Sequence, residues 1–208
     1  AFVDETADIK KAAQDIVLGA SLDNNILCIA EKSVVAMRQI EPQLVQEMVK
    51  VGCVLIENQQ DIQRLVDLTV LPNGTPNKQF VGKNASVILD AAHIPYNGDP
   101  RLIILRTPKE HPFAVIEMLM PILPVVTVDS FDEGLEVCLM LEAGLHHTAT
   151  MHSLNMERLN CMARKMKTSI FVKNGPSYAG LGFSGEGTTT FTIATPTGES
   201  TTSARCFA

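Results

Sequence analysis

Cys28 lies in a segment where a thiol is able to act as a nucleophile. It follows a polar turn at residues 23–25 (DNN) and precedes the charged pair Glu31 and Lys32. A thiolate at the end of a loop, close to backbone N–H groups, attacks a carbonyl carbon and has the resulting oxyanion stabilised. The residues alone leave open an ordinary buried cysteine as the alternative.

Glu117 is the second residue whose surroundings call for an explanation. It lies in the apolar run 115–120 (VIEMLM), which prolines bound on both sides. A carboxylate among apolar residues needs a partner or a function. A capping or salt-bridged glutamate remains as open as a functional one.

Three histidines, His146, His147 and His152, fall within one short stretch. Side chains alternate along a strand, so His147 and His152 would point to opposite sides, and no cysteine or carboxylate cluster joins them. The pattern therefore predicts no metal site. One catalytic or hydrogen-bonding histidine is possible here, but the sequence alone favours a structural role.

Residues 180–185 (GLGFSG) match the G-x-G-x-x-G pattern of dinucleotide-binding turns. That fingerprint needs a strand before it, a helix after it and an acid about 20 residues further on. A turn precedes this segment, and the residues after it do not begin a helix. At the distance where the fingerprint needs an acid, this sequence has Arg205. The pattern favours a glycine-rich turn over a phosphate cradle.

The other cysteines indicate a reducing compartment. Five cysteines is an odd number, and no pair has the C-x-x-C spacing of a zinc or redox site. Cys53 and Cys138 belong to apolar patterns and are expected in the core, whereas Cys161 lies beside the apolar stripe of a helix. Cys206 falls near the end of the sequence.

Alternating strands and helices must position these residues. The apolar spacing predicts helices at 9–20, 42–51, 59–70, from 131 onward and at 155–166. It predicts strands at 33–37, 86–89, 102–105, 125–128, 148–151 and 169–172. Thr6 or Asp4 is expected to cap the first helix, and residues 130–133 (SFDE) form a capping box. Residues 1–11 have a helical pattern.

This alternation is typical of an α/β fold with a mostly parallel sheet and helices on both faces. Residues 174–205 read instead as a loop-rich tail with β-type pieces such as 189–194. No internal repeat or linker divides the chain, so a single domain over residues 1–208 is expected.

Composition excludes several classes of protein. The 208 residues are 46% hydrophobic and 19% charged, as in a globular chain. A net charge of −6 argues against a general nucleic-acid binder. No run approaches the roughly 18 apolar residues of a membrane span, and the acidic beginning of the sequence is no signal peptide.

Around Cys28 the sequence resembles a known family. Residues 21–33 (SLDNNILCIAEKS) are similar to the catalytic-cysteine segment of CoA-acylating aldehyde dehydrogenases. Segments 117–124 (EMLMPILP), 144–153 (GLHHTATMHS), 169–180 (SIFVKNGPSYAG) and 192–199 (TIATPTGE) agree with the family in the same order. The resemblance covers essentially the whole chain and is strongest to the propionaldehyde branch found in propanediol-utilisation microcompartments.

The resemblance implies roles at matching positions. Cys28 would be the nucleophile, forming a thiohemiacetal with the aldehyde and then an acyl thioester that CoA takes up. Glu117 would hydrogen-bond the nicotinamide ribose of NAD. His147 would activate the CoA thiol or shape the site. NAD and coenzyme A are thus the expected cofactors, a small aldehyde is the expected substrate, and no metal is expected.

The resemblance also implies that relatives are about twice as long. Their first half is an NAD-binding domain, and a final strand takes part in oligomerisation; neither has a counterpart here, and Ser200 and Cys206 depart from the family pattern. The expected protein is the aldehyde dehydrogenase catalytic domain, inactive or nearly so alone and a poor binder of NAD. The full enzyme would be a homo-oligomer in the cytoplasm, within a microcompartment lumen.

Two alternatives remain open at this point. One is the acetaldehyde-specific branch of the same family, which serves ethanolamine use. The other is a non-catalytic α/β module kept for assembly, in which Cys28 is structural.

Overall fold

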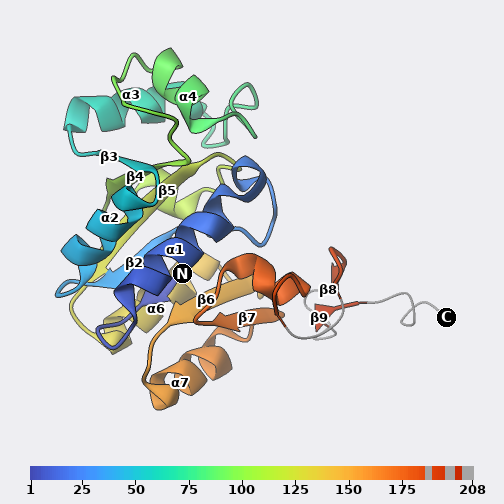
Figure 1. Ribbon diagram of the computed structural model, residues 1–208. Coiled ribbons are helices and arrows are strands. Elements are labelled where there is room, and N and C mark those ends of the chain that lie inside the picture. The colour runs from blue at the N-terminus through green and yellow to red at the C-terminus, as the bar shows by residue number, and fades with distance from the viewer. Residues whose placement is uncertain (186–188, 195–199, 203–208) are drawn as a thin grey trace.

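A seven-stranded parallel sheet forms the centre of the molecule (Figure 1). The computed structural model describes residues 1–185, 189–194 and 200–202. The strand order is β3-β4-β5-β2-β1-β6-β7, and every neighbouring pair in this sheet is parallel. The strands are β1 (Phe2–Val3), β2 (Val34–Met37), β3 (Cys53–Ile56), β4 (Leu102–Arg106), β5 (Ile122–Val128), β6 (Thr148–His152) and β7 (Ile170–Lys173).

Helices connect successive strands. They are α1 (Ile9–Ser21), α2 (Glu41–Lys50), α3 (Gln59–Thr69), α4 (Ala85–Ala91), α5 (Pro112–Val115), α6 (Phe131–Glu142) and α7 (Met156–Met166), with 3₁₀ turns η1 (Leu22–Asn25) and η2 (Ser177–Leu181). A separate antiparallel pair joins β8 (Ile193–Ala194) to β9 (Ser200–Thr201). None of the described helices is long and apolar enough to cross a bilayer.

Both faces of the sheet are covered, as the sequence predicts. Along β4, Leu102 and Ile104 join the cluster that contains α1, α2, α6 and α7, whereas Ile103 and Leu105 join the cluster formed with α3 and α4. Alternate side chains of one strand thus lie in two different hydrophobic clusters. All four residues of β2 are buried, which is typical of a parallel strand between two layers of helices.

Two expected elements differ in the structure. Residues 86–89, predicted as a strand, belong to α4, because Ile88 and Leu89 pack into the cluster of α3 and β4 from one face of a helix. Residues 2–3, predicted as part of a helical segment, form β1, which pairs with β2 and β6 at the centre of the sheet. Two apolar residues carry too little periodicity to reveal a strand.

The start of α1 also differs from expectation. Asp8 caps this helix by accepting a hydrogen bond from the Lys11 backbone N–H. Asp4 and Thr6, the expected caps, hydrogen-bond to each other, and Asp4 pairs with Arg158. The predicted capping serine, Ser130, does accept from the Glu133 backbone N–H.

The G-x-G-x-x-G segment is a turn, as its flanking residues indicate. It begins in η2, and Gly182 takes a positive φ of 88° after it. A side chain at Gly180 would lie 2.2 Å from Ile170, so close packing explains this glycine. The expected tail positions Arg205, Cys206 and most of segment 192–199 lie outside the described residues.

Candidate active site

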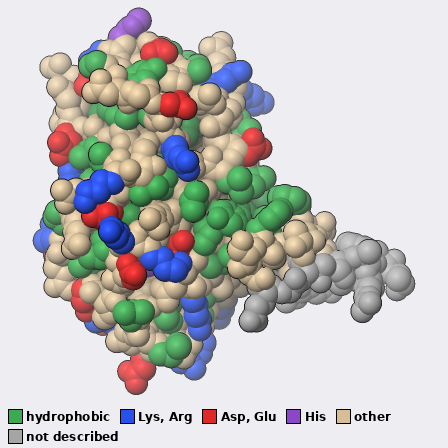
Figure 2. All heavy atoms as spheres, in the orientation of Figure 1, with side chains coloured by type: hydrophobic (Ala, Val, Ile, Leu, Met, Phe, Trp, Pro, Cys, Tyr) green, Lys and Arg blue, Asp and Glu red, His purple; other side chains and the backbone are tan. Residues whose placement is uncertain are grey.

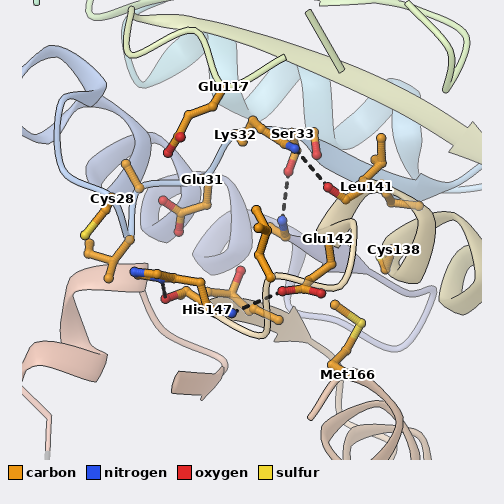
Figure 3. A pocket seen from close by; sticks show the side chains of 18 of the residues that line it. Cys28, Glu31, Lys32, Ser33, Glu117, Cys138, Leu141, Glu142, His147 and Met166 are labelled. Carbon is orange, nitrogen blue, oxygen red and sulfur yellow. Dashed lines mark hydrogen bonds between the residues drawn. The ribbon is translucent and has the colours of Figure 1, made fainter. Parts of the chain in front are cut away.

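One cavity of about 330 Å³ brings together the residues expected to do chemistry. Cys28, Glu117 and His147 all line it, although they are up to 119 residues apart in the sequence. Figure 3 shows the three side chains arranged around the same space. The cavity lies where β2 and β6 begin, since Ser33 and Thr148 also line it.

The loop that carries Cys28 is held at both of its ends. Asp23, Asn24 and Asn25 all have positive φ values, which turn the chain sharply after α1. Asn25 is buried, and its side-chain amide donates to the carbonyl oxygens of Ala20 (2.8 Å) and Glu31 (3.1 Å). Asn residues tolerate this backbone conformation better than most. The loop is thereby closed on itself with Cys28 exposed.

Asn24 joins the same loop to the layer of α4. Its amide donates to the Gly82 carbonyl oxygen (3.0 Å) and to Asn84 Oδ1 (2.8 Å). The Gly82 backbone N–H in turn donates to the carbonyl oxygen of Leu119, two residues after Glu117. The segments that carry Cys28 and Glu117 are therefore linked through the residues around Gly82.

Glu117 lies between α5 and β5 with its side chain exposed. Figure 3 shows its carboxylate directed toward the space beside Cys28 and Lys32. Its negative charge acts on Lys32: burial lowers the pKa of that amine, and the charges of Glu117 and Glu142 oppose the effect. The sequence left open a capping or salt-bridged glutamate, and in the described residues Glu117 forms neither contact.

His147 directly precedes β6 in the loop that follows α6. Its Nδ1 lies 2.8 Å from the Thr148 hydroxyl, and its backbone N–H donates to Glu142 Oε1 (3.1 Å). The imidazole is half-buried at the cavity wall. One nitrogen thus has a partner that fixes the ring orientation.

His152 has different surroundings. It is 2% exposed, its Nδ1 lies 3.9 Å from Asp15 of α1, and its Nε2 has no hydrogen-bond partner among the described residues. Burial lowers its pKa to about 3, with smaller contributions from the amino terminus and Lys11. Nowhere in the described residues do three histidine, cysteine or carboxylate side chains gather as a metal site would require.

Glu31, Lys32 and Glu142 also line the cavity, and sequence reasoning assigned them no role. Burial raises the pKa of Glu31 to about 7, although the charge of the amino terminus and then hydrogen bonds from Ser177 oppose the shift. The sequence feature that could have indicated Glu31 and Lys32 is their position as a charged pair directly before an apolar strand, where the chain enters the sheet.

Two helices end at this cavity. Glu142 is the last residue of α6 and Met166 is the last residue of α7, and both line the wall. The Lys32 ammonium donates to the Leu141 carbonyl oxygen (2.8 Å), as expected for a cation at the negative end of a helix dipole. The Leu141 carbonyl oxygen at the end of α6 is therefore turned toward a residue of the cavity lining.

The other described cysteines are less accessible. Cys53 and Cys138 are buried as predicted, and Cys161 is half-buried on α7. Burial raises the pKa of Cys53 to about 12 and that of Cys138 to about 11. Among the described cysteines, only Cys28 is exposed.

Comparison with curated proteins finds relatives of high identity. The chain is 55% identical over its full length to a CoA-propanoylating propanal dehydrogenase from Citrobacter freundii, and it covers 45% of that protein. It is 47% identical, over 99% of its length, to an acetylating acetaldehyde dehydrogenase from Salmonella typhimurium, again covering 45%. The resemblance to CoA-acylating aldehyde dehydrogenases is confirmed. No model of a protein family matches the chain.

Solved aldehyde dehydrogenases have the same fold. Rhodopseudomonas palustris propionaldehyde dehydrogenase, crystallised with propionyl-CoA, matches 99% of this chain with a TM-score of 0.96 at 46% identity, and the match covers 46% of that protein. Further similar structures hold CoA with an acylated cysteine, hold NADP⁺, or come from a fucose-utilisation bacterial microcompartment. The chain thus spans about half the length of these aldehyde dehydrogenases.

Proposed function

We propose that this chain is the thiol-bearing catalytic domain of an NAD-dependent, CoA-acylating propanal dehydrogenase. The overall reaction would convert propanal, CoA and NAD⁺ to propionyl-CoA, NADH and a proton. The observation that carries the proposal is that Cys28, Glu117 and His147 meet in one cavity. The 55% identity to a propanal dehydrogenase supports this choice of substrate.

Cys28 performs the covalent chemistry in this proposal. Its thiolate attacks the aldehyde carbonyl carbon to give a thiohemiacetal, and backbone N–H groups of the loop stabilise the oxyanion. When the C–H bond breaks, its two electrons leave with the hydride, and an acyl thioester remains on Cys28. CoA then takes the acyl group as its own thioester and returns the thiol to Cys28. A related structure with bound CoA and an acylated cysteine supports this order.

Glu117 fits a role in holding the cofactor. Its carboxylate is exposed at the cavity and makes no ion pair with another described residue, so it is free to accept hydrogen bonds from ribose hydroxyls. NAD, when bound, supplies the hydride acceptor. Glu117 would place that acceptor against the thiohemiacetal on Cys28.

His147 fits a role toward the incoming CoA thiol. A half-buried imidazole at the cavity wall, oriented by Thr148, is placed to accept a proton from a thiol that enters the cavity. CoA must lose its thiol proton before it attacks the thioester, so His147 would act at this second stage. Loss of the imidazole would then slow acyl transfer to CoA more than acylation of Cys28.

The acetaldehyde branch is the second candidate, because the identity to an acetylating relative is 47%. The proposal includes an NAD-binding domain in the complete enzyme, assembly into a homo-oligomer, and location in the cytoplasm within a bacterial microcompartment. A similar structure from such a compartment supports the last point. The assembly-module alternative predicts no turnover at all.

The test is a turnover assay with propanal, NAD⁺ and CoA, with and without the NAD-binding half of a relative added in trans. We expect NADH formation only with the added half, and its loss in the Cys28→Ala variant. Cys161→Ala is the matched control, because this half-buried cysteine lies on α7 and does not line the cavity. Full turnover by Cys28→Ala would overturn the proposal. The same assay with acetaldehyde in place of propanal distinguishes the propanal branch from the acetaldehyde branch.

A further inference from the structure

Glu31 has an unusual position for a carboxylate. It follows Cys28 by three residues on the same loop, lines the same cavity and is only 4% exposed. Figure 3 shows it between Cys28 and Lys32. Lys32 does not pair with it, because the lysine amine donates to Leu141 instead. No ion pair to Glu31 forms among the described residues.

Ser177 satisfies both oxygens of this carboxylate. The Ser177 backbone N–H donates to Glu31 Oε1 (3.0 Å), and its hydroxyl donates to Oε2 (2.8 Å). Ser177 is the first residue of η2 and is 0% exposed. Two donors from one residue on two oxygens hold the carboxyl plane in a single orientation.

The third contact comes from α1. Gly19 lies directly under the carboxyl group, and a side-chain carbon there would approach Glu31 Oε2 to 2.3 Å. Asn25 meanwhile binds the Glu31 carbonyl oxygen and the Ala20 carbonyl oxygen. Glu31 therefore joins the Cys28 loop to α1 on one side and to η2 on the other.

Cys28 depends on these anchors, because its own side chain makes no hydrogen bond in the described structure. Only residues 26–30 lie between Asn25 and Glu31, and the preceding turn already has three residues with positive φ. We infer that Glu31, bound by Ser177, is a positioning residue that fixes the Cys28 loop so that the thiol faces the cavity. This inference rests on the proposed function of Cys28.

A fluorine label on Cys28 tests the inference directly in this chain. Trifluoroacetone is attached through bromotrifluoroacetone in a Cys206→Ser background, which leaves Cys28 and the half-buried Cys161 accessible. The native chain should give one sharp fluorine NMR resonance for each site. Glu31→Gln and Ser177→Ala should shift, split or broaden the Cys28 resonance and leave the Cys161 resonance unchanged.

Ser153→Ala is the matched control. Ser153 is also 0% exposed and donates its hydroxyl to a buried carboxylate, Asp4 Oδ2 (2.7 Å), but it does not line the cavity. We expect it to leave the Cys28 resonance unchanged. An unchanged Cys28 resonance in both Glu31→Gln and Ser177→Ala would overturn the inference.

Turnover with the added NAD-binding half gives the second readout. Glu31→Gln and Ser177→Ala should each lower kcat about fivefold, with the KM for CoA and propanal within about twofold of the native values. The double variant should lose no more than the worse single one, because the two residues act as a unit. Native kcat in both single variants would overturn the inference, whereas turnover by Cys28→Ala would overturn the proposed function instead.

Discussion

Burial divides the described cysteines into reactive and protected thiols. Cys28 is exposed, whereas the raised pKa values of Cys53 and Cys138 keep these two thiols protonated. Compared with a thiol at the ordinary value of 9.0, the thiolate fraction near neutral pH falls about a thousandfold at a pKa of about 12 and about a hundredfold at about 11.

We therefore expect iodoacetamide to alkylate Cys28 first, Cys161 next, and Cys53 and Cys138 only after unfolding. Peptide mass spectrometry over a time course measures each site separately. Guanidinium chloride should abolish the differences among the four sites, which provides the control. Rapid labelling of Cys53 in the folded chain would contradict the burial seen here.

Two buried groups, Glu31 and His152, should give opposite pH dependences of stability. Burial raises the pKa of Glu31 from 4.5 to about 7, so the native state binds more protons there, and its contribution to stability is lost as pH rises through 7. Burial lowers the pKa of His152 from 6.5 to about 3, so the unfolded state binds more protons, and stability is lost as pH falls below 6.5. Each slope approaches about 1.4 kcal/mol per pH unit.

Removing one of these two groups should leave the pH dependence that the other contributes to stability. Relative to the native chain, the unfolding free energy of Glu31→Gln should increase with pH between 4.5 and 7, and that of His152→Asn should decrease with pH between 3 and 6.5. Urea unfolding at a series of pH values measures both. Parallel pH curves for the native chain and both variants would contradict the assigned shifts.

At the scale of elements, α6 fits against β1 through a glycine. A side-chain carbon at Gly134 would lie 2.4 Å from the ring of Phe2, which also stacks on Phe131 with ring centroids 5.8 Å apart. Glycine inside a helix is normally unfavourable, and its replacement by alanine gains up to about 1 kcal/mol. Here the buried ring blocks that gain.

We expect Gly134→Ala to destabilise the fold by about 1–3 kcal/mol, in the range of overpacked cores. Chemical denaturation measures the loss. Phe2→Leu makes room beside α6, so the double variant should be more stable than the sum of the two single effects predicts. Strictly additive effects would show that the Phe2 ring is not the cause of the destabilisation by Gly134→Ala.

The elements that the sequence predicts well are those with several apolar repeats. The stripe of α1 is long enough to show its period, whereas β5 is a continuous apolar run, of which the sequence predicts only residues 125–128 as a strand. Residues 86–89 are four mostly apolar residues, which fit a strand or a buried helix equally, and packing against α3 decides for α4. The two residues of β1 take strand geometry only because β2 and β6 lie on either side.

The candidate site shows the same limit. Cys28, Glu117 and His147 stand out in the sequence, the resemblance assigns their roles, and the fold brings them to one cavity. The contact of Glu31 with Ser177 joins residues 146 positions apart, so no local pattern reveals it. Likewise, the partnership of Lys32 with the end of α6 depends on how that helix packs.

At the scale of the whole molecule, charges of both signs share the face seen in Figure 2, although the net charge of the chain is −6. Figure 2 shows Lys and Arg side chains interspersed with Asp and Glu over the visible face, and hydrophobic side chains gathered beside the grey segment. The chain spans about 45% of the Citrobacter freundii relative, and only Glu117 is assigned here to the cofactor. Cofactor binding by these residues alone should therefore be weak.

We expect isothermal titration of the chain with NAD⁺ to give no saturable heat in the micromolar range. Adding the NAD-binding half of a relative should produce binding, and Glu117→Gln should then weaken it several-fold. A micromolar dissociation constant for the chain alone would contradict the expectation that most contacts lie outside it.

The ends of α6 and α7 at the cavity bear on inhibition by the free acid, which is not a product of the proposed reaction. Propanal and propionate have nearly the same shape, but only propionate carries a negative charge. It would meet the carboxylates of Glu117 and Glu142 and the negative ends of two helices. Lys32, the one lysine among the described lining residues, keeps its charge but is held at the Leu141 carbonyl oxygen by a hydrogen bond. The cavity would thus distinguish an aldehyde from its fully oxidised acid by charge alone, and accumulated acid would leave the enzyme uninhibited.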